Sequence, residues 1–502
     1  MCPAIVLGDY DLSPLHLEQI GAGHPVAAAE SGLARMQAGA AILDREVAAD
    51  RPIYGVTTGL GPQVVDRLDQ TARQAFSAAT IRGRAHAVGA PLDVDVVRAA
   101  MAVRAHTLMS GATGTRPGLA RHIVACLNAG LTPLVRESAS IGAADLLWGG
   151  MIGLGLIGEG EVHGPDGPRP AGDAFAEAGI EPWALAPREG LALASHSATM
   201  AALAAVGFAR LDAALQAAQA AAALSLEGFR ANLSPIDADI LALSPKPGQA
   251  RAAAGLHFWL EGSGLHQPGA ARRLQDPLSL RNIVQVQGAG FATLEFLEAA
   301  VLPEINHPTD NPVVLIERGD VLSGGSYLSP QLAIALQATN DATRHLAAQM
   351  SARIAKLLAN RFSDLPPGLT HQGAGGAGYG AMMKVVETLY AEIAHLAQQA
   401  PVYPSPSADG LEDTITHGAI PAKALIAITA KLHYLIAIEM MIATQAVELR
   451  EVAPAPRLGE IMRKVRDTAP PLSVERSLSA EVEALAARIG ARDFTRPAGD
   501  QA

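Results

Sequence analysis

Apolar residues recur along most of the chain at the spacing of one face of an α-helix, and the alternation typical of strands is scarce. In the first third of the chain, this pattern predicts helices over residues 70–87, 93–110 and 116–129. Farther along, the predicted helices are longer, at residues 189–230, 281–301, 329–360 and 419–452. We therefore expect an all-α protein built mainly of long helices.

A stretch rich in glycine and proline, residues 158–188, interrupts this helical pattern. We expect it to end a smaller N-terminal lobe, residues 1–188. Residues 189–502 would then form a long antiparallel helical bundle together with the C-terminal helices. A chain of 502 residues can hold two or three average domains, although an extended bundle can reach this length as one unit.

Hydrophobic residues make up 49% of the chain but aromatic residues only 4%, so Ala, Leu, Val and Ile supply most of the apolar surface. Small side chains let helices pack closely, and an excess of apolar surface favours helices that are buried between subunits. The composition therefore predicts a large helical homo-oligomer.

A net charge of −11 argues against a nucleic-acid partner, which would require clustered Lys and Arg. Cys2 and Cys126 cannot form a framework of disulfides, and the first residues lack the basic and apolar regions of a secretory signal. Arg210 and Asp212 interrupt the apolar segment 200–226, which indicates a core helix rather than a membrane span. We expect a cytoplasmic protein without a membrane partner. The scattered histidines and cysteines predict no metal site.

Five motifs, in order along nearly the whole chain, resemble the histidine/phenylalanine ammonia-lyase family. They read YGVTTGLG from Tyr54, DPLSLR from Asp276, EIN from Glu304 with DNP from Asp310, LSGG from Leu322, and LED from Leu411. The resemblance implies an α-helical homotetramer of the aspartase/fumarase type, in which three subunits build each active site and a small molecule is the substrate.

The chain departs from this family where the family builds its prosthetic group. There an Ala-Ser-Gly triplet cyclises and dehydrates into an electrophilic methylidene-imidazolone. Here Ala143 and Ala144 run directly into Asp145, so the segment is one residue short and has no serine to dehydrate. Ser195 and Leu278 also stand where the family has the Asn and Tyr that surround the group. We expect a degenerate segment without a prosthetic group, and no other cofactor.

Elimination without this electrophile requires a leaving group that departs unaided, and a trimethylammonium group does so as a neutral amine. In this respect the chain resembles the ergothionase-like branch of the family, which eliminates trimethylamine from ergothioneine to give thiourocanate. We expect a carbon–nitrogen lyase that acts on a histidine-derived betaine, with ergothioneine as the leading substrate. Hercynine or another histidine derivative, and a non-catalytic homologue that only binds, are the alternatives.

The resemblance assigns roles to several side chains. Tyr54 would remove the β-proton, and Arg281 with Asn311 would bind the substrate carboxylate through a guanidinium and an amide. His86 and Tyr327 would contact the ring. Three of these residues have a structural alternative: Tyr54 as a loop anchor, Arg281 in a salt bridge between helices, and His86 as an ordinary helix residue.

Ser195 and His196 are weaker candidates for contacts in the same pocket. Glu412 would act as ring acid or as partner of the trimethylammonium, while its neighbour Asp413 would fix the loop; capping of a helix is the alternative for both.

Lys384 lies in an apolar helical run. Burial lowers the pKa of a lysine, so Lys384 is a second candidate for the ring acid. A surface ion pair with Glu387 is the alternative.

Overall fold

The structure is a computed structural model that describes residues 3–370 and 376–497. Helices dominate it and the strands are short, which confirms the predicted all-α fold. The chain divides into two compact units. Unit 1 comprises Met1–Ala209, Glu298–Leu336 and Ala400–Lys423, and unit 2 comprises Arg210–Leu297, Gln337–Gln399 and Ala424–Ala502. Three stretches beyond residue 188 thus belong to unit 1: residues 189–209, 298–336 and 400–423.

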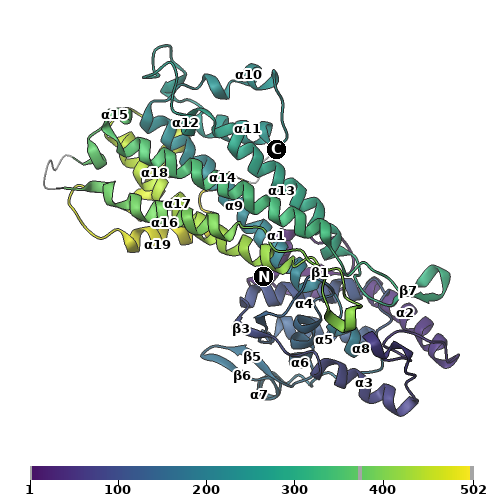
Figure 1. Cartoon of the computed structure of the whole chain (residues 1–502). Coiled ribbons are helices and arrows are strands. Elements are labelled where there is room, and N and C mark those ends of the chain that lie inside the picture. Colours follow the sequence, from purple (N-terminus) through teal and green to yellow (C-terminus); the bar gives the residue numbers. More distant parts are fainter. Residues whose placement is uncertain (1–2, 371–375, 498–502) are drawn as a thin grey trace. The chain divides into compact units, whose positions relative to one another are not determined.

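Short helices and four two-stranded sheets form most of unit 1 (Figure 1). The helices of unit 1 are α1 (Pro14–Gly21), α2 (Glu30–Ala48), α3 (Gln70–Arg82), α4 (Val94–Leu108), α5 (Pro117–Asn128), α6 (Leu146–Leu156), α7 (Ala171–Ala178) and α8 (Glu189–Ala194), with 3-10 turns η1 (Gly61–Val65), η4 (Ile316–Arg318) and η8 (Ser407–Gly410). The strands are β1 (Ile5–Leu7), β2 (Val26–Ala28), β3 (Val88–Pro91), β4 (Arg136–Ser138), β5 (Glu161–Gly164), β6 (Gly167–Pro170), β7 (Val313–Leu315) and β8 (Asp320–Leu322). They pair in the order β1-β2, β3-β4, β5-β6 and β7-β8, the first pair parallel and the others antiparallel.

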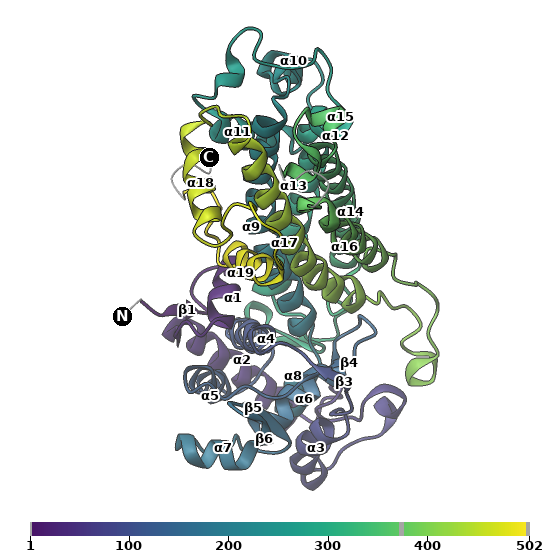
Figure 2. The same cartoon turned by 90° about the vertical axis from the view of Figure 1, so that its left-hand side faces the viewer.

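Four long helices run side by side through unit 2 in both views (Figures 1 and 2): α9 (Ala198–Phe229), α13 (Ile283–Asn306), α14 (Pro330–Leu358) and α17 (Ala419–Glu448). Shorter elements complete this unit: α10 (Ala238–Ala242), α11 (Gln249–Leu260), α12 (Leu278–Arg281), α15 (Asn360–Ser363), α16 (Met383–Leu396), α18 (Pro456–Arg466), α19 (Ser479–Gly490) and the 3-10 turns η2 (Ser234–Ile236), η3 (Gly264–His266), η5 (Pro367–Leu369) and η7 (Gly378–Met382). The middle of α9 is rich in alanine and mostly buried, which combines high helix propensity with close packing.

Two predicted helices have different limits in the structure. The helix predicted over residues 70–87 ends at Arg82, and Gly83 follows as its C-cap. The helix predicted over residues 189–230 is broken between α8 and α9. At this break the N–H of His196 donates to the Ala144 carbonyl and the N–H of Ser197 donates to Thr309 Oγ1, so contacts distant in sequence replace the helical hydrogen bonds.

Two stretches are long and apolar enough to cross a membrane, Glu189–Phe229 and Ala419–Glu448. Of their most apolar windows, 94% and 67% are buried inside the protein, as in the core helices of a water-soluble protein. Cys126 is a free, buried thiol, and Cys2 lies outside the described residues. Because the apolar window within Glu189–Phe229 is buried, the prediction of a core helix over residues 200–226 agrees with the structure.

Candidate active site

A cavity of about 540 Å³ in unit 1 gathers residues from segments that are far apart in the sequence. Its lining comprises Tyr54, Leu60, Gly61, Pro62, Val64, Gly83, Arg84, Ala144, Leu146, Leu191, Ser195, Asn311, Tyr327, Ala408, Leu411 and Glu412. Six of the residues singled out from the sequence meet here: Tyr54, Ala144, Ser195, Asn311, Tyr327 and Glu412. A surface cavity of about 630 Å³ in unit 2 contains none of the predicted site residues.

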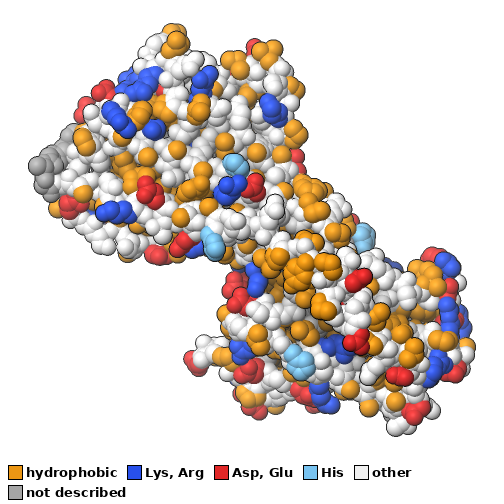
Figure 3. Space-filling view, in the orientation of Figure 1, with side chains coloured by type: hydrophobic (Ala, Val, Ile, Leu, Met, Phe, Trp, Pro, Cys, Tyr) orange, Lys and Arg blue, Asp and Glu red, His pale blue; other side chains and the backbone are white. Residues whose placement is uncertain are grey.

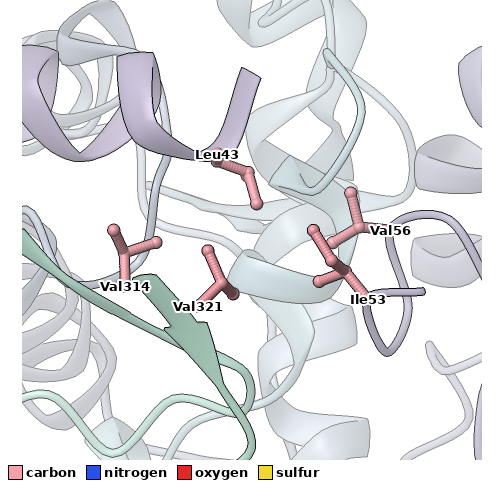
Figure 4. Close-up of a cluster of buried hydrophobic side chains, with 5 residues drawn as sticks. All are labelled: Leu43, Ile53, Val56, Val314 and Val321. Atoms are coloured by element: carbon pink, nitrogen blue, oxygen red, sulfur yellow. The ribbon is translucent and has the colours of Figure 1, made fainter. Parts of the chain in front are cut away.

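The loop that carries Tyr54 is anchored by apolar packing on both sides of the tyrosine. Ile53 and Val56 are buried in a cluster with Leu43 of α2 and with Val314 and Val321 of the β7–β8 hairpin (Figure 4). The hairpin begins directly after Asn311-Pro312, so one cluster holds both the tyrosine loop and the asparagine segment.

The phenol of Tyr54 is oriented by a backbone contact. The N–H of Gly61, at the start of η1, donates a hydrogen bond to Tyr54 Oη at 3.0 Å. A hydrogen-bond donor aimed at an oxygen favours negative charge on that oxygen. η1 also contacts η8, which precedes Glu412, and so the tyrosine loop and the glutamate loop lie close together.

The degenerate segment keeps a tight, left-handed turn although its central residues are not glycine. Gly142, Ala144 and Asp145 have φ angles of +81°, +58° and +43°. The N–H of Ala144 donates to the Tyr327 carbonyl at 3.0 Å, and the Ala144 carbonyl accepts from the N–H of His196 at 2.9 Å. A segment that has no serine to dehydrate, and in which the N–H and the carbonyl of Ala144 are both hydrogen-bonded, does not fit the family's prosthetic group.

Asp145 ends this turn and stands directly before α6. Its carboxylate accepts hydrogen bonds from Ser140 Oγ at 2.5 Å and from the N–H of Met200 at 2.9 Å. Burial raises the pKa of Asp145 to about 6. Burial also raises the pKa of Glu304, and Asp145 adds to that effect. Asp145 thus holds the turn through its two hydrogen bonds, and neither Asp145 nor Glu304 lines the cavity.

Ser195 reaches the cavity because α8 ends there, while its neighbour His196 points into the protein. His196 Nε2 donates to the Leu193 carbonyl at 3.0 Å, and its Nδ1 accepts from the N–H of Ala198 at 3.1 Å. Burial lowers the pKa of His196 to about 3. The neutral ring therefore holds the helix break together, and His196 is not among the residues that line the cavity.

Buried charges fix the backbone at Asn311. Arg104 forms a two-pronged salt bridge with Asp310, and Arg188 donates to the carbonyls of Asn311 and Pro312. The side-chain Oδ1 of Asn311 accepts from the N–H of Gly324 at 3.0 Å. This bond orients the amide, so that its NH₂ group remains to donate to a bound carboxylate.

Glu412 lies in the loop between η8 and α17, several residues before the helix begins, so it does not cap that helix. It is half-buried, and burial raises its pKa while Arg84 opposes the rise. Asp413 is exposed, and its carbonyl accepts from the N–H of Ser405 within the same loop. Arg84 itself was not predicted. It occupies the cavity just after α3, and burial lowers its pKa while Tyr54 and Glu412 counteract that effect.

Ala143 of the degenerate segment does not line this cavity, and neither do three of the residues predicted to bind or activate the substrate. His86 is exposed in the loop after α3. Arg281 is exposed in unit 2, where it donates to Gln275 Oε1 at 2.9 Å instead of forming a salt bridge between helices. Lys384 is exposed in the first turn of α16, and among the described residues it forms no ion pair with Glu387. Leu278, the replacement for the family's tyrosine, is also exposed in unit 2.

Comparison with known proteins identifies the relatives of this site. A model of aromatic amino acid lyases matches residues 12–467. Histidine ammonia-lyase of Anaeromyxobacter sp. is 33% identical over 95% of this chain and 97% of its own length. The enzyme of the same name from Streptomyces avermitilis is 36% identical over 85% of this chain and 84% of its own length. The chain belongs to the aromatic amino acid lyase family.

Solved structures of aromatic amino acid lyases and related enzymes share its fold. Ergothionase from Treponema denticola, in complex with desmethyl-ergothioneine sulfonic acid, gives a TM-score of 0.91 at 24% identity, covering 98% of this chain and 99% of that one. Histidine ammonia-lyase from Trypanosoma cruzi gives 0.91 at 25% identity, covering 99% and 97%. The family model and the histidine ammonia-lyases confirm the resemblance to the ammonia-lyase family, and the protein is a carbon–nitrogen lyase.

Proposed function

We propose that this lyase eliminates trimethylamine from a histidine-derived betaine, with ergothioneine as substrate and thiourocanate as product. One observation carries the proposal: the turn at Ala143, Ala144 and Asp145 has no serine from which to build an electrophile, whereas Tyr54 and Asn311 remain in the cavity. A substrate with a quaternary nitrogen needs no electrophile, because its nitrogen leaves as a neutral amine.

In the proposed reaction the Tyr54 phenolate takes the β-proton of the substrate. The electrons of that C–H bond form the double bond between Cα and Cβ, and the electrons of the Cα–N bond leave with trimethylamine. The proton stays on Tyr54 until it passes to solvent. A positioned base of this kind accelerates a reaction by roughly 10²–10⁴-fold.

The ring must withdraw electrons while the β-proton leaves. We assign this activation to Glu412, because its half-buried carboxyl has a raised pKa and can hold a proton to donate to the ring. The NH₂ group of Asn311 binds the substrate carboxylate. Tyr327 borders the same cavity as a ring contact, and the small side chains of Ala144 and Ser195 leave room for a bulky leaving group.

In this proposal, Arg281 and Lys384 act in the active site of a neighbouring copy of the chain. Both are exposed in unit 2, outside the cavity lining. Large apolar side chains are exposed as well, including Leu243, Leu274 and Leu278 at 86%, 88% and 68%, and hydrophobic side chains are visible in several places on the face shown in Figure 3. We propose a homotetramer that covers such surfaces and lets Arg281 and Lys384 complete the site of a neighbouring subunit.

A product assay on a panel of substrates tests the proposed function. Purified protein is incubated with ergothioneine, hercynine and histidine, and the released amine is identified together with the near-ultraviolet absorbance of the unsaturated product. Release of trimethylamine from ergothioneine supports the proposal. Release from hercynine alone would identify hercynine, the betaine without sulfur, as the substrate. Activity confined to histidine, the substrate named in its curated relatives, would refute it.

A further inference from the structure

Arg188, the residue directly before α8, has a backbone conformation that residues with side chains seldom adopt. Its φ angle is +79° and its ψ angle is −35°, and its carbonyl accepts a hydrogen bond from the N–H of Ala192 in the first turn of α8. A residue other than glycine is strained in this region, and such strain persists only where the surrounding structure enforces it. The contacts of the Arg188 side chain supply this constraint.

The guanidinium of Arg188 is buried and holds the backbone on both sides of the Asn311 side chain. Its Nη1 donates to the Asn311 carbonyl at 3.3 Å, its Nη2 to the Pro312 carbonyl at 2.9 Å, and its Nε to the Thr113 carbonyl at 3.2 Å. Asn311 lines the cavity, whereas Arg188 does not. Arg188 thus fixes a residue of the cavity lining without entering the cavity itself.

The buried charges around Arg188 do not cancel. Oδ1 of Asp310 lies 3.7 Å from Arg188 Nη2 and 2.7 Å from Arg104 Nη2, and 1% or less of each of these three side chains is exposed. Among the described residues, Asp310 is the one acidic partner of both arginines. Burial and the Arg104 charge lower the pKa of the neighbouring His196 to about 3, so its ring is neutral. Two guanidiniums therefore share one carboxylate, which leaves one positive charge in excess.

A buried positive charge without its own anion is unfavourable, because it has lost its hydration. Burial lowers the pKa of Arg188 to about 10, so the guanidinium is still charged at neutral pH. A carboxylate bound at the Asn311 amide would bring the missing negative charge close to this group, since Arg188 contacts the Asn311 backbone directly. The amide and the excess charge therefore favour the same ligand group.

We propose that Arg188 is a positioning residue for the substrate carboxylate: its hydrogen bonds hold Asn311, and the excess positive charge favours an anion at the Asn311 amide. This inference rests on the proposed function in one respect, the binding of the substrate carboxylate by Asn311. It extends that function to the preference of the site for a carboxylate over a neutral group of the same shape. It does not depend on which amine leaves.

Equilibrium binding of matched ligands tests the proposal. One pair is thiourocanate, the proposed product, and its carboxamide, which has the same shape without the charge; the other pair is urocanate and its carboxamide. At pH 7.5 the wild type should bind each carboxylate at least about tenfold more tightly than the matching amide. A wild type that binds acid and amide equally well would refute the proposal.

Two variants of Arg188 separate its charge from its packing. Arg188→Gln removes the charge and should lower the preference for the carboxylate about tenfold, with a much smaller change in the affinity for the amide. Arg188→Lys keeps the charge and should retain most of the preference. If Arg188→Gln weakens acid and amide equally, Arg188 only supports the loop and the proposal fails.

Arg116→Gln is the matched control. Arg116 Nη2 lies 2.7 Å from Oε2 of the buried Glu189, the residue after Arg188, and Arg116 does not line the cavity. This variant disturbs the start of α8 as well, but it removes a charge that already has its own anion. It should lose stability in thermal denaturation and keep the wild-type preference between acid and amide. A preference lowered as much as in Arg188→Gln would contradict the proposal.

Asp310→Asn gives a result of opposite sign and serves if Arg188→Gln does not fold. It raises the excess charge from one to two, so the preference for the carboxylate should increase, whereas simple disruption of the loop would decrease it. A decrease would overturn the proposal. Because urocanate and thiourocanate are compared in parallel, the role of Arg188 can be confirmed or refuted even if the substrate panel shows that trimethylamine is not released.

Discussion

Arg104 and Asp310 form a salt bridge in which both side chains are buried, with 2.7 Å between Nη2 and Oδ1 and 3.0 Å between Nη1 and Oδ2. Asp310 directly precedes Asn311, so this bridge fixes the residue that we assign to the substrate carboxylate. Asp310→Asn should lower the free energy of unfolding by about 3–5 kcal/mol, because it leaves the Arg104 charge uncompensated. Urea denaturation measures the change.

The exposed pair Arg82–Glu159 provides the control for that experiment. Glu159→Gln should lower the free energy of unfolding by at most about 1 kcal/mol, since a surface pair is screened by solvent. If the two variants lose stability equally, the buried bridge is not the element that holds the Asn311 segment.

Tyr54→Phe removes one oxygen and should abolish turnover, with a loss of about 10²–10⁴-fold in kcat. The fold should remain intact, because the packing of the loop depends on Ile53 and Val56 rather than on the phenol. Circular dichroism checks that the fold is intact, and steady-state assays measure the loss of turnover. Tyr10→Phe, at an exposed position outside the cavity, should leave turnover unchanged. A Tyr54→Phe protein with wild-type activity would exclude Tyr54 as the base.

Comparison of the sequence with the family motifs predicted six of the sixteen residues that line the cavity. Tyr54, Asn311 and Glu412 come from three separate motifs, and the structure brings them together through the apolar cluster and the η1–η8 contact. Sequence patterns identified the helices as well, because an apolar face repeats locally.

Features that depend on distant contacts were not predictable in the same way. The break at Ser195 exists because Ala144 and Thr309 supply partners to the backbone there, and nothing in the local helical pattern marks those partners. Arg84 was missed for a similar reason. Arg82 is the last residue of α3 and Arg84 comes two residues later, and only tertiary packing places the first on the surface and the second in the cavity.

Gly142 should be irreplaceable in the degenerate turn. It has φ +81°, and an added Cβ would lie 2.2 Å from Thr416 Oγ1 and 2.7 Å from the His417 nitrogen. Gly130→Ala is the control, because it has φ +73° but nothing within 4 Å of an added Cβ. Gly130→Ala should cost about 1–2 kcal/mol from backbone strain alone. Gly142→Ala should cost about 1–3 kcal/mol more because of the clash. Equal losses in thermal denaturation would contradict this account.

Buried His196 should make stability depend on pH. Burial, with a smaller contribution from the Arg104 charge, lowers its pKa to about 3 in the folded protein, against 6.5 in the unfolded chain. Below pH 6.5 the unfolded state takes up a proton that the folded state does not, so the contribution of the neutral ring is lost as the pH falls. His196→Asn keeps an acceptor for Ala198 but does not titrate.

The stability difference between the wild type and His196→Asn should therefore shrink by about 1.4 kcal/mol for each pH unit below 6.5. Urea denaturation at pH 7.5, 6 and 5 gives this difference directly. A stability difference that stays constant over this pH range would contradict the prediction. It would mean that the ring is already protonated in the folded protein, or that the neutral ring does not stabilise the helix break.

Mixing two inactive variants tests whether neighbouring subunits share active sites. Tyr54 lines the cavity of unit 1, whereas Arg281 is exposed in unit 2. In the proposed tetramer, each active site therefore combines Tyr54 of one chain with Arg281 of another chain. Tyr54→Phe and Arg281→Ala should each be inactive alone. Co-expressed in equal amounts, they should form tetramers in which about one site in four has both wild-type residues. Activity in the mixture near a quarter of the wild-type value supports shared sites. If each chain builds its own site, the mixture stays inactive, because every chain lacks one of the two residues.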